Sequence, residues 1–319
     1  MKLDPSILDD AEKLNFALRA LYLRHGCTRY RMGKFEEYDL YARNKDFLLS
    51  DNIITFTDTN GRLMALKPDV TLSIVKSRKD MPGTLEKLCY NESVYRVSSG
   101  TGAFREQMQA GVECIGSVDA RCVGETLHLA AESLALCAPD FVLEVSHLDI
   151  LRSFLEDVSE SSAVRRSILH CVGEKNLHGI SGICRDEGIA WGKAEALRAL
   201  LDVYGTAAEA MPRLEELCAG RSLDSELAYL RAALAVPEEA GLGGRIRLNF
   251  SSVSNMNYYN GVLFKGFIEG VPGSVLSGGQ YDKLMRKLGK RSKAVGFAVY
   301  LDMLERLGDR GMSVPAFGK

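Results

Sequence analysis

The first stretch of the chain has apolar residues in the rhythm of a helix. Between Ile7 and His25 they recur at helical spacing, and Gly26 follows at the point where a helix would end. We therefore expect an opening helix over residues 7–25. Farther on, two β-prone runs flank Asn60-Gly61, a pair typical of hairpins because both residues tolerate a positive φ.

A short helix is expected directly after Pro68 and Asp69. Apolar residues recur there over 70–75, and Asp69 stands where a helix N-terminus favours a carboxylate. Six further apolar runs are typical of β-strands, at 93–97, 111–116, 141–145, 245–250, 262–268 and 294–300, and one long helix is predicted over 124–136. The strands do not alternate regularly with crossover helices, which favours an α+β fold with an antiparallel sheet over a doubly wound parallel one.

The pattern changes between about residues 159 and 237. Helix-forming residues dominate, strand signals vanish, and helix breaks fall at Gly173, Gly179, Gly188, Pro212 and Gly220. We interpret this region as a helical subdomain inserted into the sheet-forming part of the chain.

Composition narrows the classes of function. The 319 residues are 46% hydrophobic and 26% charged, which is typical of an ordered globular protein. A net charge of −2 argues against a broad grip on phosphate backbones, so we expect no dedicated tRNA binding, and we interpret the basic run over 286–293 as a solvated loop. No signal-like leader or run of about 18 apolar residues occurs, so we expect a cytoplasmic protein without a membrane span.

The cysteines and the single tryptophan suggest no chemistry of their own. The eight cysteines form no CxxC pair and have no Cys/His spacing suited to zinc, so we expect buried, reduced thiols and neither a metal nor a cofactor. We also expect Trp191 to be a buried structural residue.

Candidate ligand chemistry is concentrated near the C-terminus. The segments are NMNYYNGVLFKGF at 255–267, SVLSGGQYDKLM at 274–285 and AVGFAVYLDMLERL at 294–307. Paired tyrosines beside a glycine, and a Gly-Gly turn before Gln-Tyr-Asp, would place hydroxyl groups and backbone amides around one cavity. Such a cavity suits a small polar ligand.

These three segments resemble, in order, the two signature motifs of histidyl-tRNA synthetases and motif 3 of class II synthetases. Upstream, ALKPDVTLSIVK at 65–76 is similar to that family's Leu-Arg-Pro-Glu-x-Thr segment, and SVYRVSSGTGAFREQMQAGVECIG at 93–116 is similar to motif 2. The resemblance implies a class II synthetase-like antiparallel sheet flanked by helices. The core would be discontinuous, over residues 1–158 and 238–319, with the helical insertion at 159–237.

The resemblance also implies a histidine site. Positions that hold histidine in the family retain suitable side chains here: Asp69, Thr71, Gln109, Glu113, Tyr258, Tyr259, Gly278, Gly279 and Tyr281. Asp69 would meet the α-amino group, and Glu113 with a tyrosine could bind the imidazole nitrogens. Each residue has a simpler interpretation: Asp69 as a helix N-cap, Gln109 and Glu113 as solvent-facing strand positions, the tyrosines as core aromatics, and the two glycines as a tight turn.

Positions that handle ATP in the family have mostly changed. Arg96 of motif 2 remains as a possible phosphate ligand or as a salt-bridging residue, but Ser98 replaces a glutamate that reads adenine. Ser254 and Met303 replace two arginines. Loss of one preorganised donor costs about 10²–10³ in rate, so aminoacylation is not expected. The family's anticodon-binding domain would follow motif 3, yet the sequence ends at Lys319, so we expect that domain to be missing.

A synthetase core with an amino-acid pocket but altered catalytic positions resembles the regulatory subunit of ATP phosphoribosyltransferase. The resemblance implies a hetero-octamer with the short-form catalytic subunit in the first step of histidine biosynthesis, with L-histidine as feedback effector, and a dimer of this chain. The motif 1 segment at 33–37 lacks the family's proline, which leaves the dimer interface undefined. A divergent histidyl-tRNA synthetase and a synthetase-like amino-acid or RNA-binding module remain as alternatives.

Overall fold

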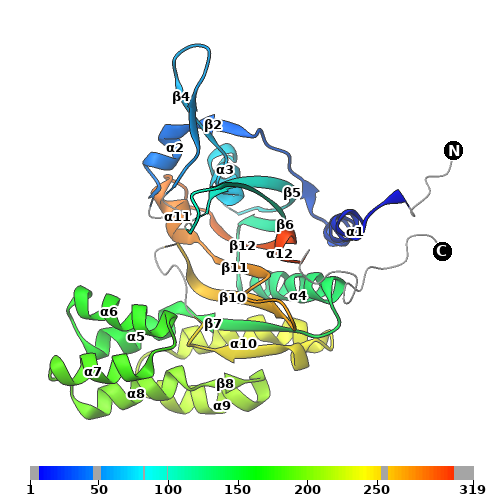
Figure 1. Ribbon diagram of the computed structural model, residues 1–319. Helices are drawn as coiled ribbons and strands as arrows, with labels where there is room; N and C mark the ends of the chain where they lie inside the picture. The colour runs from blue at the N-terminus through cyan, green and yellow to red at the C-terminus, as the bar shows by residue number, and fades with distance from the viewer. Residues whose placement is uncertain (1–6, 46–51, 82, 99, 253–257, 305–319) are drawn as a thin grey trace.

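A nine-stranded sheet forms the centre of the protein (Figure 1). The computed structural model describes residues 7–45, 52–81, 83–98, 100–252 and 258–304. The strands, in the order β1-β5-β6-β12-β11-β10-β7-β9-β8, are β1 (Thr28–Arg29), β5 (Leu85–Val97), β6 (Phe104–Gly116), β12 (Lys293–Tyr300), β11 (Leu276–Gln280), β10 (Asn260–Ile268), β7 (Phe141–His147), β9 (Ile246–Asn249) and β8 (Tyr204–Gly205). All neighbours are antiparallel except the pairs β1–β5 and β7–β9. The expected α+β fold is confirmed.

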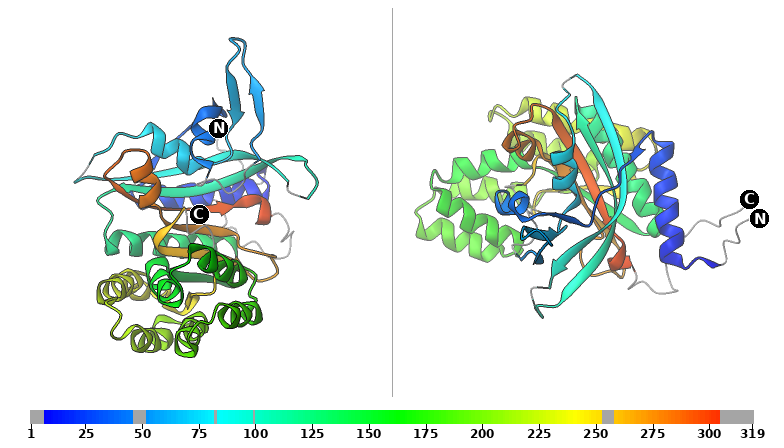
Figure 2. Two further views of the ribbon diagram at one scale, coloured as in Figure 1. Left: turned by 90° about the vertical axis from the view of Figure 1, so that its left-hand side faces the viewer. Right: turned by 90° about the horizontal axis from the view of Figure 1, so that it is seen from above.

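Helices cover both faces of this sheet, as the view from above in Figure 2 shows. On one face lie α1 (Asp10–Arg24) and α4 (Ala120–Cys137), whose apolar sides join the larger core cluster. On the other face lie α2 (Tyr38–Ala42), α3 (Val70–Ser77) and α11 (Asp282–Lys287), which enclose a second cluster around Tyr90 and Tyr281. Because the inner half of β6, together with β11 and β12, is covered on both faces, polar side chains such as Gln109, Glu113 and Gln280 are buried.

The Asn-Gly hairpin belongs to a separate small sheet. Its strands β2 (Phe35–Glu37), β4 (Leu63–Leu66) and β3 (Thr55–Thr57) pair in that order and antiparallel. Within the connecting loop Gly61 has a φ of +80°, and the Asp58 carboxylate accepts hydrogen bonds from the backbone N–H groups of Asn60 and Arg62. The hairpin prediction is confirmed.

The region interpreted as an insertion is mainly helical. It contains α6 (Ser162–Gly173), α7 (Leu177–Asp186), α8 (Trp191–Leu201), α9 (Ala207–Cys218) and most of α10 (Asp224–Glu239), and α5 (Leu148–Val158) leads into it from β7. The expectation that strands are absent here was wrong at β8, which pairs with β9 of the main sheet. Since α10 also packs against α4, the division into a core and an inserted subdomain stays a prediction.

Several local predictions need correction. Gly278 and Gly279 lie inside β11 and not in a turn. They are glycines because the backbones of the neighbouring strands come so close that a Cβ would clash, with β12 at Gly278 and with β10 at Gly279. Trp191 is 78% exposed, so the expectation that it is buried was wrong. The basic run begins in α11 and continues as a mainly exposed loop before β12, as expected, and Lys290 anchors it by donating to the carbonyl oxygens of Val75 and Arg78.

The cysteines follow the expectation more closely. All eight are unpaired thiols, and seven of them are buried, while Cys171 is half-buried. In the described residues, no helix combines the length and the apolar character that crossing a membrane would require.

Candidate functional site

A small cavity lies between the sheet and α3. Eight residues that the sequence singled out line it together: Asp69, Thr71, Arg96, Gln109, Glu113, Tyr258, Tyr259 and Tyr281. They come from β5, β6, α3 and the segments that precede β10 and α11, which are far apart in the sequence. The interpretation of Gln109 and Glu113 as solvent-facing residues was wrong, because their exposed fractions are 4% and 1%.

Glu113 is the centre of the polar groups in this cavity. The hydroxyl of Thr71 donates to its Oε1 at 2.6 Å, and the hydroxyl of Tyr281 donates to its Oε2 at 2.5 Å. Burial raises the pKa of Glu113 to about 8, against the opposing effect of these two hydrogen bonds. A buried carboxyl of this kind gains its charge most readily when a ligand supplies an N–H donor or a positive charge.

Asp69 supplies a second buried carboxylate to the same cavity. Its Oδ1 accepts the backbone N–H of Leu72 at 2.7 Å, so it is the N-cap of α3 as well as a cavity residue. Burial raises the pKa of Asp69, and the positive charge of Arg96 acts in the opposite direction. Arg96 is held beside Asp69 by a hydrogen bond of 3.3 Å from its Nε to the carbonyl oxygen of Pro68. The N-cap interpretation is confirmed, and it does not exclude a role in binding.

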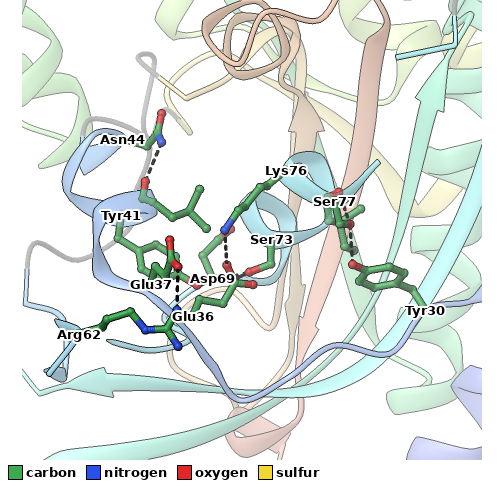
Figure 3. A network of polar contacts seen from close by, with 12 residues as sticks. Tyr30, Glu36, Glu37, Tyr41, Asn44, Arg62, Asp69, Ser73, Lys76 and Ser77 are labelled. Atoms are coloured by element: carbon green, nitrogen blue, oxygen red, sulfur yellow. Dashed lines mark hydrogen bonds and ion pairs between the residues drawn. The ribbon is translucent and has the colours of Figure 1, made fainter. Parts of the chain in front are cut away.

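A network of polar contacts holds α3, and thereby Asp69, against its neighbours (Figure 3). The hydroxyl of Ser73 donates to the backbone oxygen of Asp69 and lies 3.4 Å from the hydroxyl of the buried Tyr41. At the far end of the helix, Ser77 contacts Tyr30 at 2.6 Å, and Lys76 pairs with Glu36 at 3.7 Å. Contacts along the length of α3 therefore position its first turn against the cavity.

The connection into α3 contains a buried ion pair. Lys67 is fully buried, and its Nζ lies 2.9 Å from Oε2 of Glu92 on β5. Its backbone N–H donates to Lys34, and its backbone oxygen accepts from Tyr95. These contacts tie the residues before Asp69 to both sheets.

Gln109 has an unused donor. Its side-chain amide nitrogen, Nε2, is buried and has no hydrogen-bond partner among the described residues. A buried donor without an acceptor costs about 1–3 kcal/mol, so a ligand oxygen at this point would remove a penalty that the free protein carries.

Tyr258, Tyr259 and Tyr281 form a wall of the cavity that is apolar and carries hydroxyl groups. The rings of Tyr258 and Tyr259 lie 4.6 Å apart, and those of Tyr258 and Tyr281 lie 6.0 Å apart. Burial raises the pKa of each hydroxyl, so all three remain neutral near pH 7. They are core aromatics and cavity residues at the same time.

Glycines create the space for this arrangement. A Cβ on Gly296 of β12 would overlap Oε2 of Glu113. Gly278 and Gly279, which the sequence placed in the site, do not line the cavity. A Cβ on Gly279 would lie 2.8 Å from the ring of Tyr259, so the absence of a side chain here leaves room for that ring.

Two altered ATP positions, Ser98 and Met303, lie outside this cluster. Ser98 follows β5 in the turn to β6, where its backbone bonds to Gly102 and Ala103, and Met303 lies in α12 (Leu301–Leu304) packed against the larger core. Neither lines the cavity. Ser254 falls outside the described residues.

The sequence analysis missed six residues of the cavity: Tyr90, Ser277, Gly296, Phe297, Ala298 and Tyr300. Four of them, Ser277, Gly296, Ala298 and Tyr300, lie in β11 and β12 at alternate positions, which period-2 alternation assigns to the face that carries the site. Phe297 has the opposite parity and packs in the larger core, so alternation would not have found it. Tyr90 could not have been found in this way, because β5 was predicted only from residue 93 onward and the residue falls outside that run.

Comparisons with known proteins show the family and the fold of the chain. The family model for histidyl-tRNA synthetase matches residues 2–304. The chain is 30% identical over 267 residues to the ATP phosphoribosyltransferase regulatory subunit of Caldanaerobacter subterraneus subsp. tengcongensis, covering 82% of this chain and 70% of the relative. It is 29% identical over 294 residues to the protein of the same name from Thermoanaerobacter sp. strain X514, covering 91% and 76%.

The chain belongs to the histidyl-tRNA synthetase family, among its ATP phosphoribosyltransferase regulatory subunits. Solved structures of this family share the fold. A regulatory subunit/histidyl-tRNA synthetase from Bacillus halodurans matches with a TM-score of 0.82 at 23% identity, covering 94% of this chain and 79% of that one. A histidyl-tRNA synthetase from Nostoc sp. PCC 7120 matches with a TM-score of 0.78 at 17% identity, covering 93% and 71%. The predicted class II synthetase-like fold is confirmed.

Proposed function

We propose that this chain is a non-catalytic regulatory subunit of ATP phosphoribosyltransferase, which binds L-histidine in the cavity around Glu113 and transmits feedback to a short-form catalytic subunit. Two findings support a partner of this kind. The curated relatives carry that name, and the fold matches a chain of the ATP phosphoribosyl transferase (HisG:HisZ) complex from Thermotoga maritima with a TM-score of 0.69 at 17% identity, covering 92% of this chain and 97% of that one.

The observation that carries the histidine proposal is the set of complementary groups in one buried cavity. Asp69 offers a carboxylate for an α-ammonium group, and Glu113 offers a second carboxylate for an imidazole N–H. The unpartnered Nε2 of Gln109 can donate to a ligand carboxylate. Free histidine presents these three kinds of group, whereas an amino acid with an aliphatic side chain would offer Glu113 no donor beyond the hydroxyls of Thr71 and Tyr281.

The lack of catalysis rests on the positions that differ. Arg96 lines the cavity, yet it lies beside Asp69 and contacts Pro68. Ser254 and Met303 stand where the family has arginines, and neither offers a positive charge. Formation of an adenylate develops negative charge on the reacting phosphate and carboxylate oxygens, which preorganised cations stabilise. We therefore expect this chain to bind histidine without activating it.

Feedback requires that histidine bind two states of the assembly with different affinity. Closure of the cavity residues around histidine, with β5 and β6 held to α3 through Lys67 and Glu113, would favour one arrangement of the subunits. A coupling of about 1–3 kcal/mol is sufficient for useful feedback.

The test combines the purified chain with a short-form ATP phosphoribosyltransferase. The initial rate of condensation of ATP with phosphoribosyl pyrophosphate is measured for the catalytic subunit alone, for the mixture, and for the mixture with histidine. We expect the chain to raise the rate and histidine to lower it. No stimulation together with no histidine response would overturn the proposal.

A matched pair of variants locates the histidine site. In Glu113→Gln the buried carboxylate is replaced by an amide, and loss of one hydrogen bond to a charged group, worth about 1.5–3 kcal/mol, should raise the inhibitory histidine concentration roughly 10–100-fold. Glu187→Gln makes the same chemical change at an exposed position after α7 and should leave inhibition as in the unmodified chain. Equal inhibition of both variants would place the effector site elsewhere.

The enzyme alternative has its own test. ATP–pyrophosphate exchange with histidine should stay at background for this chain, with a catalytically complete histidyl-tRNA synthetase as positive control. An appreciable exchange rate would make the chain a divergent synthetase. The RNA-binding alternative is tested by the electrophoretic mobility of tRNA at moderate salt. A mobility shift on addition of the chain would favour that alternative, and the net charge of −2 predicts none.

A further inference from the structure

Two histidines and a glutamate meet on the face of the sheet that carries α1 and α4, opposite the cavity around Glu113. His25 caps the C-terminal end of α1, and His128 and Glu132 lie one turn apart on α4. Figure 2 shows these two helices side by side when the molecule is viewed from above. The packing of α1 on α4 brings together residues that are distant in the sequence.

The ligand atoms of the three side chains converge. Nε2 of His25 lies 2.8 Å from Oε2 of Glu132, and Nε2 of His128 lies 3.3 Å from the same oxygen. One ligand atom from each residue lies within 4.8 Å of the other two, and the ring centroids are 5.8 Å apart. The side chains are 20–35% exposed, so an ion from solvent can reach them.

We propose that His25, His128 and Glu132 bind a divalent transition-metal ion such as Zn²⁺. Two imidazole nitrogens and one carboxylate oxygen are ligands that Zn²⁺ uses when it keeps a fourth position open. With Zn–N distances of about 2.0–2.1 Å, tetrahedral ligand atoms lie about 3.3–3.5 Å apart, so small side-chain movements from the observed positions suffice. This site lies outside the histidine cavity, and the proposal is independent of the proposed function.

The surroundings provide a second observation. A cavity beside the cluster is lined by both histidines and also by the thiols of Cys27, Cys114 and Cys122. The cavity leaves room beside the two imidazoles, and imidazole ligands favour borderline ions such as Zn²⁺ over Mg²⁺ or Ca²⁺, which prefer oxygen ligands. The neighbouring cation, Lys87, is paired with Glu125 at 2.8 Å, so its charge is balanced near the site.

The simpler interpretation is that two imidazoles share one carboxylate by hydrogen bonding alone. In that case the cluster would show no preference for transition metals. The chain contains a natural control for this interpretation. His170 of α6 and Glu174, which caps that helix, form a pair with the same spacing at 3.4 Å, without a third ligand in the described part of the chain.

The test measures Zn²⁺ binding to the purified full chain after treatment with a chelator. Titration with ZnCl₂ against a chromophoric competitor should show one site, and Zn²⁺ should raise the melting temperature because it joins α1 to α4. His128→Ala and Glu132→Gln should each weaken Zn²⁺ binding at least about 10–100-fold. A loss of that size is already seen when a residue that only hydrogen-bonds to a metal ligand is changed. His170→Ala should bind Zn²⁺ as the unmodified chain does.

Co²⁺ distinguishes the ligand set. Co²⁺ that is bound by nitrogen and oxygen ligands should give visible absorption bands. It should lack the strong near-ultraviolet charge-transfer absorption that thiolate ligands cause. Cys122→Ser should therefore leave the spectrum unchanged. If folding is lost in His128→Ala, which circular dichroism would show, His25→Gln provides the second ligand deletion. Unchanged Zn²⁺ affinity in folded ligand variants, or binding that depends only on the thiols, would overturn the proposal.

Discussion

Two glutamates on opposite sides of the main sheet each meet two donor groups, but in different surroundings. Glu113 is 1% exposed and accepts from the neutral hydroxyls of Thr71 and Tyr281. The side chain of Glu132 is 33% exposed and faces two imidazoles. Burial holds the carboxyl of Glu113 close to its neutral form, whereas Glu132 is open to solvent and to ions dissolved in it. The same side chain therefore suits recognition of an organic ligand in one place and an ion in the other.

The largest expected loss of stability comes from breaking the buried ion pair between Lys67 and Glu92. In Glu92→Gln, the ammonium group of the fully buried Lys67 loses its partner. We expect the free energy of unfolding to fall by about 3–5 kcal/mol, because an uncompensated charge remains in the interior. Urea unfolding measures this. Asp10→Asn, which breaks the partly exposed pair with Lys13 on α1, should cost less than about 1 kcal/mol, and a similar loss in both variants would contradict the argument from burial.

The next effect concerns the space in front of Glu113. In Gly296→Ala a Cβ would overlap Oε2 of Glu113 and the backbone oxygen of Val112. Overpacking of this kind costs about 1–3 kcal/mol of stability, and we expect histidine binding to be lost as well. Calorimetric titration with histidine and thermal unfolding provide the two measurements. Gly192→Ala, where a Cβ meets nothing within 4 Å, is the matched control. Normal histidine binding by Gly296→Ala would show that the ligand lies elsewhere.

The pH dependence of stability should distinguish the two glutamates. Burial raises the pKa of Glu113 from 4.5 to about 8, so the folded state favours the protonated form. That contribution is fully present below about pH 4.5 and is lost as pH rises toward 8, so the unliganded chain should become less stable across this window. Glu113→Gln should remove this part of the pH dependence. Chemical unfolding between pH 5 and pH 8.5 measures it, and an unchanged slope in the variant would mean that Glu113 keeps an ordinary pKa.

The smallest effect is expected at the surface cluster without metal. In chelator-treated protein, Glu132→Gln should change the free energy of unfolding by less than about 1 kcal/mol, because half-exposed ion pairs contribute little. With Zn²⁺ present, the difference in stability between the unmodified chain and this variant should increase, because only the unmodified chain binds the ion through Glu132. Thermal unfolding with and without the ion measures both values, and a large metal-free loss would mean that Glu132 is mainly structural.

Much of the fold could be predicted from residues close together in the chain. The opening helix was expected over 7–25 and spans Asp10–Arg24, and the helix expected over 124–136 spans Ala120–Cys137. Strands were predicted too short, or not predicted at all, where their residues are polar or small. The outer half of β6, which begins at Phe104, is exposed and lacks an apolar pattern, and β11 contains Gly278 and Gly279. Local pattern therefore identified elements with a buried stripe and missed those stabilised mainly by their neighbours.

The candidate site was predictable in part, for a similar reason. The resemblance named Asp69, Glu113 and Tyr281, and the structure places them around one cavity. It could not assign Gly296, because the need for a glycine there arises from the approach of β12 to β6. The expectation for Trp191 did not come from the resemblance. It failed because large aromatics are usually buried, and the sequence does not show that α8 turns this one toward solvent.

The sequence alone determined the helices, most strands, the class of fold and the types of group available to a ligand, because periodicity and residue chemistry act over short distances along the chain. Only the tertiary structure decided which groups meet. The order of strands in the sheet encloses Glu113 between Thr71 and Tyr281, and the packing of α1 on α4 brings His25 to His128 and Glu132. These contacts depend on interactions between distant segments, for which no local pattern carries a signal.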